Sequence, residues 1–251
     1  MTTYNALRDL PGQAGYGKGD VFVLFGELFG RGYANGLVEE ARKAGMTVIG
    51  ITVGRRDPDG ALRPLNGQEL ADSEAFLGGK IINIPLEAGF DMDRTGPAPS
   101  PADQLKGIKS DGWESAELDW DAVDRSRKAG AARFGHNLAK VSAELDRMIP
   151  AGANVLFSHT MAGGIPRARI LMPVMNRVFK GQGERYTASE FFWKSELGRL
   201  CSLCFDEVTA DTFGHLIDAT GPIRERIASQ GGKVVYTAYG YHGCEVLING
   251  V

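Results

Sequence analysis

Residues 21–53 read VFVLFGELFGRGYANGLVEEARKAGMTVIGITV, and the fold class follows from the pattern of this segment. Val21–Phe25 is a continuous apolar run, which is typical of a strand buried on both faces of a parallel sheet. A glycine-rich turn follows, then a helical stretch from about Tyr33 to Ala44, and then a second buried strand at Thr47–Val53. We therefore predict a strand–turn–helix–strand unit of about 35 residues.

The rest of the chain continues this alternation. Further strands are predicted at Lys80–Ile84, Asn154–Phe157 and Lys233–Ala238, with helical stretches between them. Strands that alternate with helices along a whole chain are typical of a doubly wound parallel sheet. We expect one NAD(P)-binding α/β domain of Rossmann type over residues 1–251, with helices flanking the sheet. Residues 87–119 are rich in proline and glycine and are predicted to be an insertion.

The glycine-rich turn has the spacing Gly26-x-x-x-Gly30-x-Gly32. Gly26 permits a tight turn out of the strand, Gly30 lets the backbone approach a pyrophosphate, and Gly32 lets the helix pack closely. The helix directs its N-terminal N–H groups at the anion. Glycines in such a turn can also serve geometry alone. Here the strand, the helix and the second strand all stand at the expected distances, so we predict a dinucleotide site.

The residues after the second strand indicate which dinucleotide binds. An NAD site usually places an acidic residue there, to accept from the ribose hydroxyls. This chain has Arg55 and Arg56 instead, and two guanidiniums can hold a 2′-phosphate through charge-assisted hydrogen bonds. Arg31 in the turn is a third candidate. The alternative is that these arginines solvate a surface loop, with Asp57 as an ion-pair partner. We expect NADP(H) as cofactor, with NAD(H) less favoured.

The glycine spacing resembles that of the short-chain dehydrogenase/reductase superfamily, from which the sequence otherwise diverges. In that superfamily an Asn-Asn-Ala-Gly segment follows the fourth strand and lies beneath the nicotinamide ribose. Ala162 and Gly163 match its second half, so the resemblance implies that they contact the cofactor. His159 is expected at the carboxyl edge of the sheet, where ligands bind in such folds. It is either a cofactor contact or a hydrogen-bonded structural histidine.

The catalytic pattern of the superfamily is not matched. Its standard members carry a serine after the fifth strand and a Tyr-x-x-x-Lys pair on the next helix. Beyond Lys233 this sequence has no lysine. The Ala238-Tyr239 step is similar to the Ser-Tyr step after the fifth strand of enoyl-[acyl-carrier-protein] reductases, which reduce enoyl thioesters with NAD(P)H. The resemblance implies an acting tyrosine about ten residues further on, where this sequence ends. Tyr239 and Tyr241 are the catalytic candidates within the sequence; the alternative is that both hydroxyls are satisfied at the sheet edge.

Two interpretations of the missing pair stay open. Either the sequence is the shortened form of a longer protein, or it is a reduced relative without ordinary catalysis; in both, the C-terminal strands of the superfamily sheet are expected to be absent. The leading hypothesis is an NADPH-dependent reductase of an enoyl or ketoacyl thioester in fatty-acid or polyketide metabolism. A tyrosine hydroxyl would stabilise the developing oxyanion. The alternative is a non-catalytic sensor or regulatory protein that binds NADP(H).

The composition argues against nucleic acid or a membrane as partner and favours a reducing compartment. The net charge of −3 gives no electrostatic footprint for nucleic acid or an anionic membrane. The apolar runs fall short of the roughly 20 residues that a membrane span needs. The three cysteines favour a reducing compartment, so a cytoplasmic location is expected.

An acyl thioester is the expected partner, with an acyl carrier protein as a further candidate. The apolar stripe at Phe134–Met148 predicts helix pairing in a homo-oligomer, by analogy with the superfamily. Cys201 and Cys204 lie on a helical stripe and are interpreted as core residues, so no metal site is expected.

Overall fold

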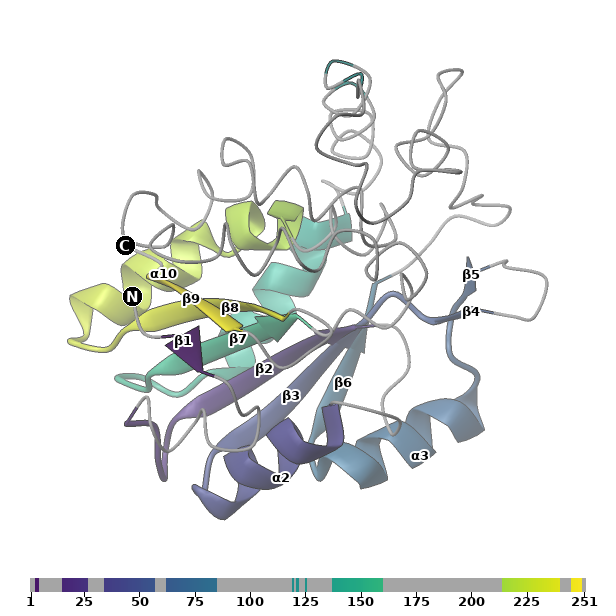
Figure 1. The fold of residues 1–251 in the computed structure, drawn as a ribbon, viewed down its shortest axis with the longest axis horizontal. Helices are drawn as coiled ribbons and strands as arrows, with labels where there is room; N and C mark the ends of the chain where they lie inside the picture. Colours follow the sequence, from purple (N-terminus) through teal and green to yellow (C-terminus); the bar gives the residue numbers. More distant parts are fainter. Residues whose placement is uncertain are drawn as a thin grey trace, which may run out of the picture.

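A largely parallel sheet with helices on both faces forms the centre of the molecule (Figure 1). The computed structural model describes residues 3–4, 15–26, 34–56, 62–84, 119, 121, 125, 137–159, 214–239 and 245–249. Within them, seven strands form one sheet in the order β1-β9-β8-β7-β2-β3-β6. These strands are β1 (Thr3–Tyr4), β2 (Val21–Gly26), β3 (Thr47–Thr52), β6 (Lys80–Asn83), β7 (Val155–His159), β8 (Val234–Tyr239) and β9 (Glu245–Asn249).

Five of these strands are parallel and confirm the predicted fold class. β2 pairs with β3 on one side and with β7 on the other, β3 continues to β6, and β7 continues to β8. The predicted strands match these five with boundaries that differ by one or two residues. All six residues of β2 are buried, as expected of the central strand of a sheet covered on both faces.

Two strands at one edge were not predicted. β9 runs antiparallel to β8, and the short β1 runs antiparallel to β9. The pattern of parallel strand–helix–strand units in the sequence ends with the fifth predicted strand. An antiparallel neighbour needs only a short connection, and five residues separate β8 from β9. The sheet therefore gains an antiparallel border beyond its fifth parallel strand.

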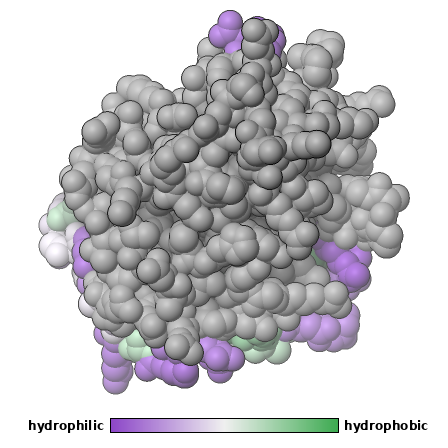
Figure 2. All heavy atoms as spheres, in the orientation of Figure 1, coloured by the Kyte–Doolittle hydropathy of each residue, from purple (hydrophilic) through white to green (hydrophobic). Residues whose placement is uncertain are grey.

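The helices cover the sheet in two layers. α2 (Ala34–Lys43) and α3 (Gly67–Leu77) lie on one face, below the sheet in Figure 1, and α10 (Gly221–Ser229) lies on the other. The helical residues 137–148 lie beside α10, as the 2.8 Å hydrogen bond from Arg226 of α10 to Asp146 shows. The described atoms along the lower margin of Figure 2, where α2 and α3 lie, are mostly hydrophilic.

A buried core joins β2 and its neighbours to α2 and α3. Phe22 and Leu24 project from β2 into a cluster that includes Val38 and Ala41 of α2 and Leu77 of α3. Burying an aliphatic or aromatic side chain of this size contributes about 1.5–3 kcal/mol. The alternate residues of β2 are also fully buried. The central strand is therefore fixed from both faces.

A polar joint aligns the amino ends of three parallel strands. The carboxylate of Asp20, just before β2, accepts hydrogen bonds from the backbone N–H and the side-chain amide of Asn154 at 2.9 and 3.0 Å. It also accepts from the backbone N–H of Gly17 at 2.9 Å. The Asn154 side chain in turn accepts from the backbone N–H of Lys233 at 3.0 Å. This joint ties β2 to β7 and β8.

Several predictions lie outside the described residues. The proposed insertion at 87–119 is described only at Asp119, and Cys201 and Cys204 are not described. In the described part of the chain, no helix is both long and apolar enough to cross a membrane. Within the same residues, no three His, Cys, Asp or Glu side chains gather as metal ligands. The single-domain organisation stays a prediction.

Candidate functional site

The carboxyl ends of the parallel strands form one row of residues. Gly26 at the end of β2 pairs with Thr52, which in turn pairs with Asn83 at the end of β6. On the other side of β2, His159 pairs with Ala238 of β8. The register of β2 with β7 places His159 beside the residue that precedes Gly26. The predicted residues Gly26 and His159 therefore lie on neighbouring strands at the same edge.

This edge contains the point at which the order of the strands reverses. From β2 the chain passes through α2 to β3 and through α3 to β6, on one side of the sheet. It then returns to β7 and β8 on the other side of β2. In open α/β sheets, ligands bind outside the carboxyl ends of the strands at such a reversal. Gly26 and His159 come from the two strands that flank it.

Part of the predicted site is outside the described residues. This applies to Gly30, Arg31, Gly32, Ala162, Gly163 and Tyr241, and to the side chains of Arg56, His159 and Tyr239. Their roles stay predictions. The backbone of β8 ends at Tyr239, two strands from β2, and α2 is helical from Ala34, soon after the glycine turn.

Gly54 controls how the chain leaves β3. Its φ of +114° lies in the region that favours glycine, and its backbone N–H donates to the Thr52 hydroxyl at 2.9 Å. A Cβ atom at Gly54 would lie 2.1 Å from the carbonyl oxygen of Arg63. The absence of a side chain at Gly54 therefore lets two segments meet, the end of β3 and the strand that carries Arg63.

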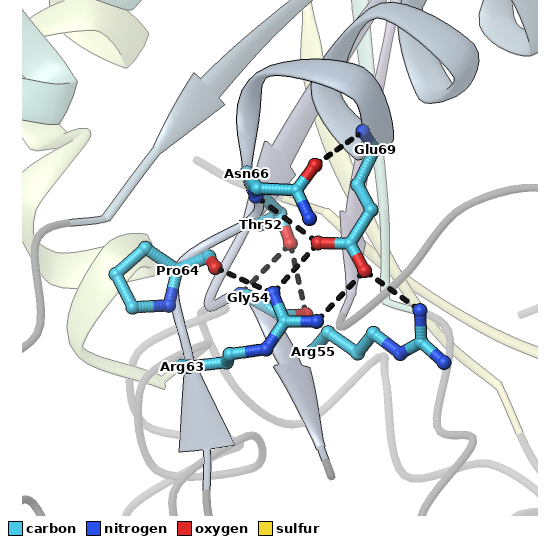
Figure 3. A network of polar contacts seen from close by, with 7 residues as sticks. All are labelled: Thr52, Gly54, Arg55, Arg63, Pro64, Asn66 and Glu69. Carbon is cyan, nitrogen blue, oxygen red and sulfur yellow. Dashed lines mark hydrogen bonds and ion pairs between the residues drawn. The ribbon is translucent and has the colours of Figure 1, made fainter.

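A small two-stranded sheet follows Gly54 and carries both arginines of an ionic cluster. β4 (Arg55–Arg56) pairs antiparallel with β5 (Leu62–Arg63), and Arg55 stands opposite Arg63. Figure 3 shows both guanidiniums directed at the carboxylate of Glu69, in the first turn of α3. Arg55 donates to Glu69 at 2.6 Å, and Arg63 donates to its two oxygens at 2.7 and 2.8 Å. We call Arg55, Arg63 and Glu69 the arginine–glutamate cluster.

Glu69 is fixed from both ends. It forms a capping box with Asn66: the Asn66 side chain accepts from the Glu69 N–H, and the Glu69 carboxylate accepts from the Asn66 N–H, both at 3.0 Å. The hydrogen bond from Arg63 is the main cause that holds the pKa of Glu69 far below its ordinary value, followed by the one from the Asn66 backbone. The carboxylate is therefore ionised at neutral pH.

One of the three cluster residues, Arg55, could be predicted from the sequence. Arg55 was predicted as a phosphate ligand, and its alternative was an ion pair with Asp57; the structure gives Glu69 as an ion-pair partner of Arg55. Arg63 and Glu69 were missed. The Asn66-x-x-Glu69 spacing was a readable capping signal, but nothing local indicated that a hairpin would bring Arg63 beside it.

A second polar cluster is centred on Tyr236 of β8, earlier in the same strand than the predicted Tyr239. Tyr236 is fully buried, and its hydroxyl lies 2.6 Å from the Thr220 hydroxyl and 3.0 Å from Nη1 of Arg224. Its ring stacks on Phe157 with centroids 4.8 Å apart. Burial raises the pKa of Tyr236, against the opposing charge of Arg224. This tyrosine is a neutral structural anchor, which fixes the strand that ends at Tyr239.

Comparison with known proteins identifies the family. The family model described as "Enoyl-acyl carrier protein reductase FabMG" matches residues 3–251. A solved structure described as "Apo structure of FabMG, novel types of Enoyl-acyl carrier protein reductase" is 56% identical, with a TM-score of 0.54. The match covers 90% of this chain and 51% of that one, so the chain spans about half the length of its structural relative. No curated protein matches.

The resemblance to enoyl-acyl carrier protein reductases, carried in the sequence by the Ala238-Tyr239 step, is thereby confirmed. Membership of the wider dehydrogenase/reductase superfamily stays a prediction, with which the parallel strand order agrees. The family model spans nearly every residue from the first strand to the end of the sequence. The chain therefore belongs to the FabMG family of enoyl-acyl carrier protein reductases.

Proposed function

We propose that this chain carries the NADPH site of an enoyl reductase and that its substrate is an enoyl thioester, presented on an acyl carrier protein. The observation that carries the proposal is the family match over residues 3–251. The sheet supports it, because the strand reversal between β2 and β7 lies where α/β folds bind dinucleotides.

The residues present fit a nicotinamide dinucleotide with a 2′-phosphate. Gly26 ends the central strand at the reversal, and its backbone carbonyl accepts from Val53 at 3.2 Å, which holds the exit of β3 beside it. Arg55 lies directly beyond that exit, and its side chain is 41% exposed. A cation at this position suits a phosphate on the adenosine ribose. These residues would hold the adenosine half of the cofactor.

Bound NADPH supplies the hydride that reduces the double bond. The chain must then hold the thioester against the nicotinamide and stabilise the negative charge that develops on the thioester oxygen. Tyr239 and Tyr241 are our candidates for that hydroxyl. Tyr239 ends β8, beside the strand that carries His159, and Tyr236 anchors the same strand. We propose that one of these two tyrosines donates the hydrogen bond to the thioester oxygen.

The test is the loss of NADPH absorbance with a crotonyl thioester on acyl carrier protein, compared with NADH and with the saturated butyryl thioester. We expect oxidation of NADPH with the enoyl substrate alone. Tyr239→Phe or Tyr241→Phe should lower kcat on the order of 10²–10⁴-fold, with little change in the binding of NADPH. Binding of NADPH without any oxidation by enoyl or ketoacyl thioesters would overturn the proposal.

A further inference from the structure

We infer that Arg63 recognises the adenosine 2′-phosphate together with Arg55, and that Glu69 is the positioning residue that holds both guanidiniums ready for it. The inference rests on the proposed NADPH-dependent function and deepens it, by naming a specificity-determining residue and its support. It follows from the contacts that Figure 3 draws.

Arg63 lies on the same small hairpin as Arg55. Arg63 stands opposite Arg55 in the β4–β5 pair. Directly opposed residues of an antiparallel pair have Cβ atoms about 5 Å apart on the same face, so both side chains leave the hairpin together. Gly54 brings the Arg63 backbone against the end of β3. The hairpin thus places a second guanidinium beside the one predicted to bind the phosphate.

Hydrogen bonds occupy both carboxylate oxygens of Glu69. Its Oε1 accepts from Arg55 and Arg63, and its Oε2 accepts from Arg63 and the Asn66 N–H. A carboxylate offers about four acceptor sites, so these contacts fill them. The side chain is also only 14% exposed. Glu69 is therefore unable to accept from ribose hydroxyls in the way that an acidic residue of an NAD site does.

The arginine–glutamate cluster has more positive than negative groups. Two guanidiniums and one carboxylate leave a net charge of +1, on a surface where the side chains of Arg55 and Arg63 are 41% and 36% exposed. Each guanidinium has five N–H donors. Arg55 gives one of them to Glu69, and Arg63 gives hydrogen bonds to both Glu69 oxygens and to the Pro64 carbonyl. A planar fork that is already oriented loses less conformational entropy when it binds a phosphate.

A structural role alone would predict something different. The cluster also ties the hairpin to the first turn of α3, and such a tie stabilises the fold without any effect on cofactor choice. The two roles separate in the ratio of NADPH to NADH affinity. Loss of a tie weakens both cofactors equally, whereas loss of a phosphate ligand weakens NADPH alone.

The experiment measures dissociation constants for NADPH and NADH by fluorescence titration at fixed ionic strength. Wild type should prefer NADPH. Arg63→Gln should weaken NADPH by about tenfold or more and leave NADH within about twofold, because a hydrogen bond to a charged group is lost. Arg63→Lys keeps the charge without the fork, so it should give an intermediate ratio and serves if the glutamine variant does not fold.

Glu69→Gln gives the sharpest result. Removal of a negative charge would raise phosphate affinity if only net charge mattered. We expect the opposite, a several-fold weaker binding of NADPH, because the guanidiniums lose their fixed positions. The matched control is Arg226→Gln, which breaks an ion pair of similar length with Asp146 beside α10. It should leave the NADPH to NADH ratio unchanged.

Three outcomes would overturn the inference. If wild type prefers NADPH and Arg63→Gln keeps that preference, Arg63 is a structural residue and the proposed function still stands. If Glu69→Gln binds NADPH more tightly, Glu69 competes with the phosphate instead of positioning its ligands. If wild type itself shows no preference for NADPH, both this inference and the cofactor assignment of the proposed function fail.

Discussion

Replacement of Gly54 by alanine tests whether the close approach of β3 to β5 builds the arginine–glutamate cluster. Two costs are expected. The φ of +114° is strained for any residue with a Cβ atom, at about 1–3 kcal/mol. The added methyl group would also lie 2.1 Å from the Arg63 carbonyl oxygen, where ordinary contact begins at 3.4 Å. The two groups must therefore separate by about 1.3 Å (3.4 less 2.1 Å), which costs about 1–3 kcal/mol as overpacking.

Gly19→Ala is the matched control for Gly54→Ala. Gly19 has a similar φ of +95°, but a Cβ atom there would meet nothing within 4 Å. It therefore carries the backbone cost without the contact. We expect Gly54→Ala to be less stable than Gly19→Ala by about 1–3 kcal/mol, measured as the free energy of unfolding in urea.

The same pair of variants has a functional readout. The shift of the hairpin should separate Arg63 from Glu69, so Gly54→Ala should also lose preference for NADPH, whereas Gly19→Ala should keep it. If both variants unfolded at the same urea concentration with the same slope, and both kept the wild-type cofactor ratio, the approach of β3 to β5 would not build the cluster.

Four further predictions concern the supports of the site. Tyr236→Phe should cost about 1–2 kcal/mol in urea unfolding, because it removes the hydroxyl that contacts Thr220 and Arg224. The cost is no larger because both side chains keep their contacts to the Ile217 carbonyl, and a cost near zero would contradict the network. Because the folded pKa of Tyr236 is raised, wild type should also lose stability relative to Tyr236→Phe as pH rises above about 10, seen by circular dichroism. Asp20→Ala should cost about 2–4 kcal/mol, since it removes acceptors for three N–H bonds; a neutral result would show that the strand ends are held otherwise. The folded pKa of Glu69 is lowered, so the stability advantage of wild type over Glu69→Gln should be full above pH 4.5 and shrink as pH falls below it.

The sheet could be predicted from the sequence because its central strands are buried on both faces. Val21–Phe25 is a continuous apolar run, and Val48, Ile49 and Ile51 are the buried apolar residues of Thr47–Thr52. Burial of these side chains makes both strands readable in the sequence. β9 was missed because a five-residue antiparallel strand leaves a weaker pattern and needs no helix before it. Tertiary pairing decides such strands more than local sequence does.

The candidate site was predictable where it depends on chain order and not where it depends on folding back. The position of Arg55 follows from its place after the second strand of the unit. The role of Glu69 depends on a hairpin that returns Arg63 to it, across contacts that no periodicity encodes. Tyr236 and Tyr239 look alike in the sequence, and only the buried contacts to Thr220 and Arg224 mark the first as structural.

The central claim, hydride transfer from NADPH to an enoyl thioester, is tested most directly with NADPH that carries deuterium at the transferred position of the nicotinamide. Incubation with a crotonyl thioester on acyl carrier protein, followed by mass spectrometry of the acyl group, reports the transfer itself. We expect a saturated butyryl product that holds one deuterium per NADPH oxidised. Recovery of unchanged crotonyl groups, with NADPH bound but still labelled, would contradict it.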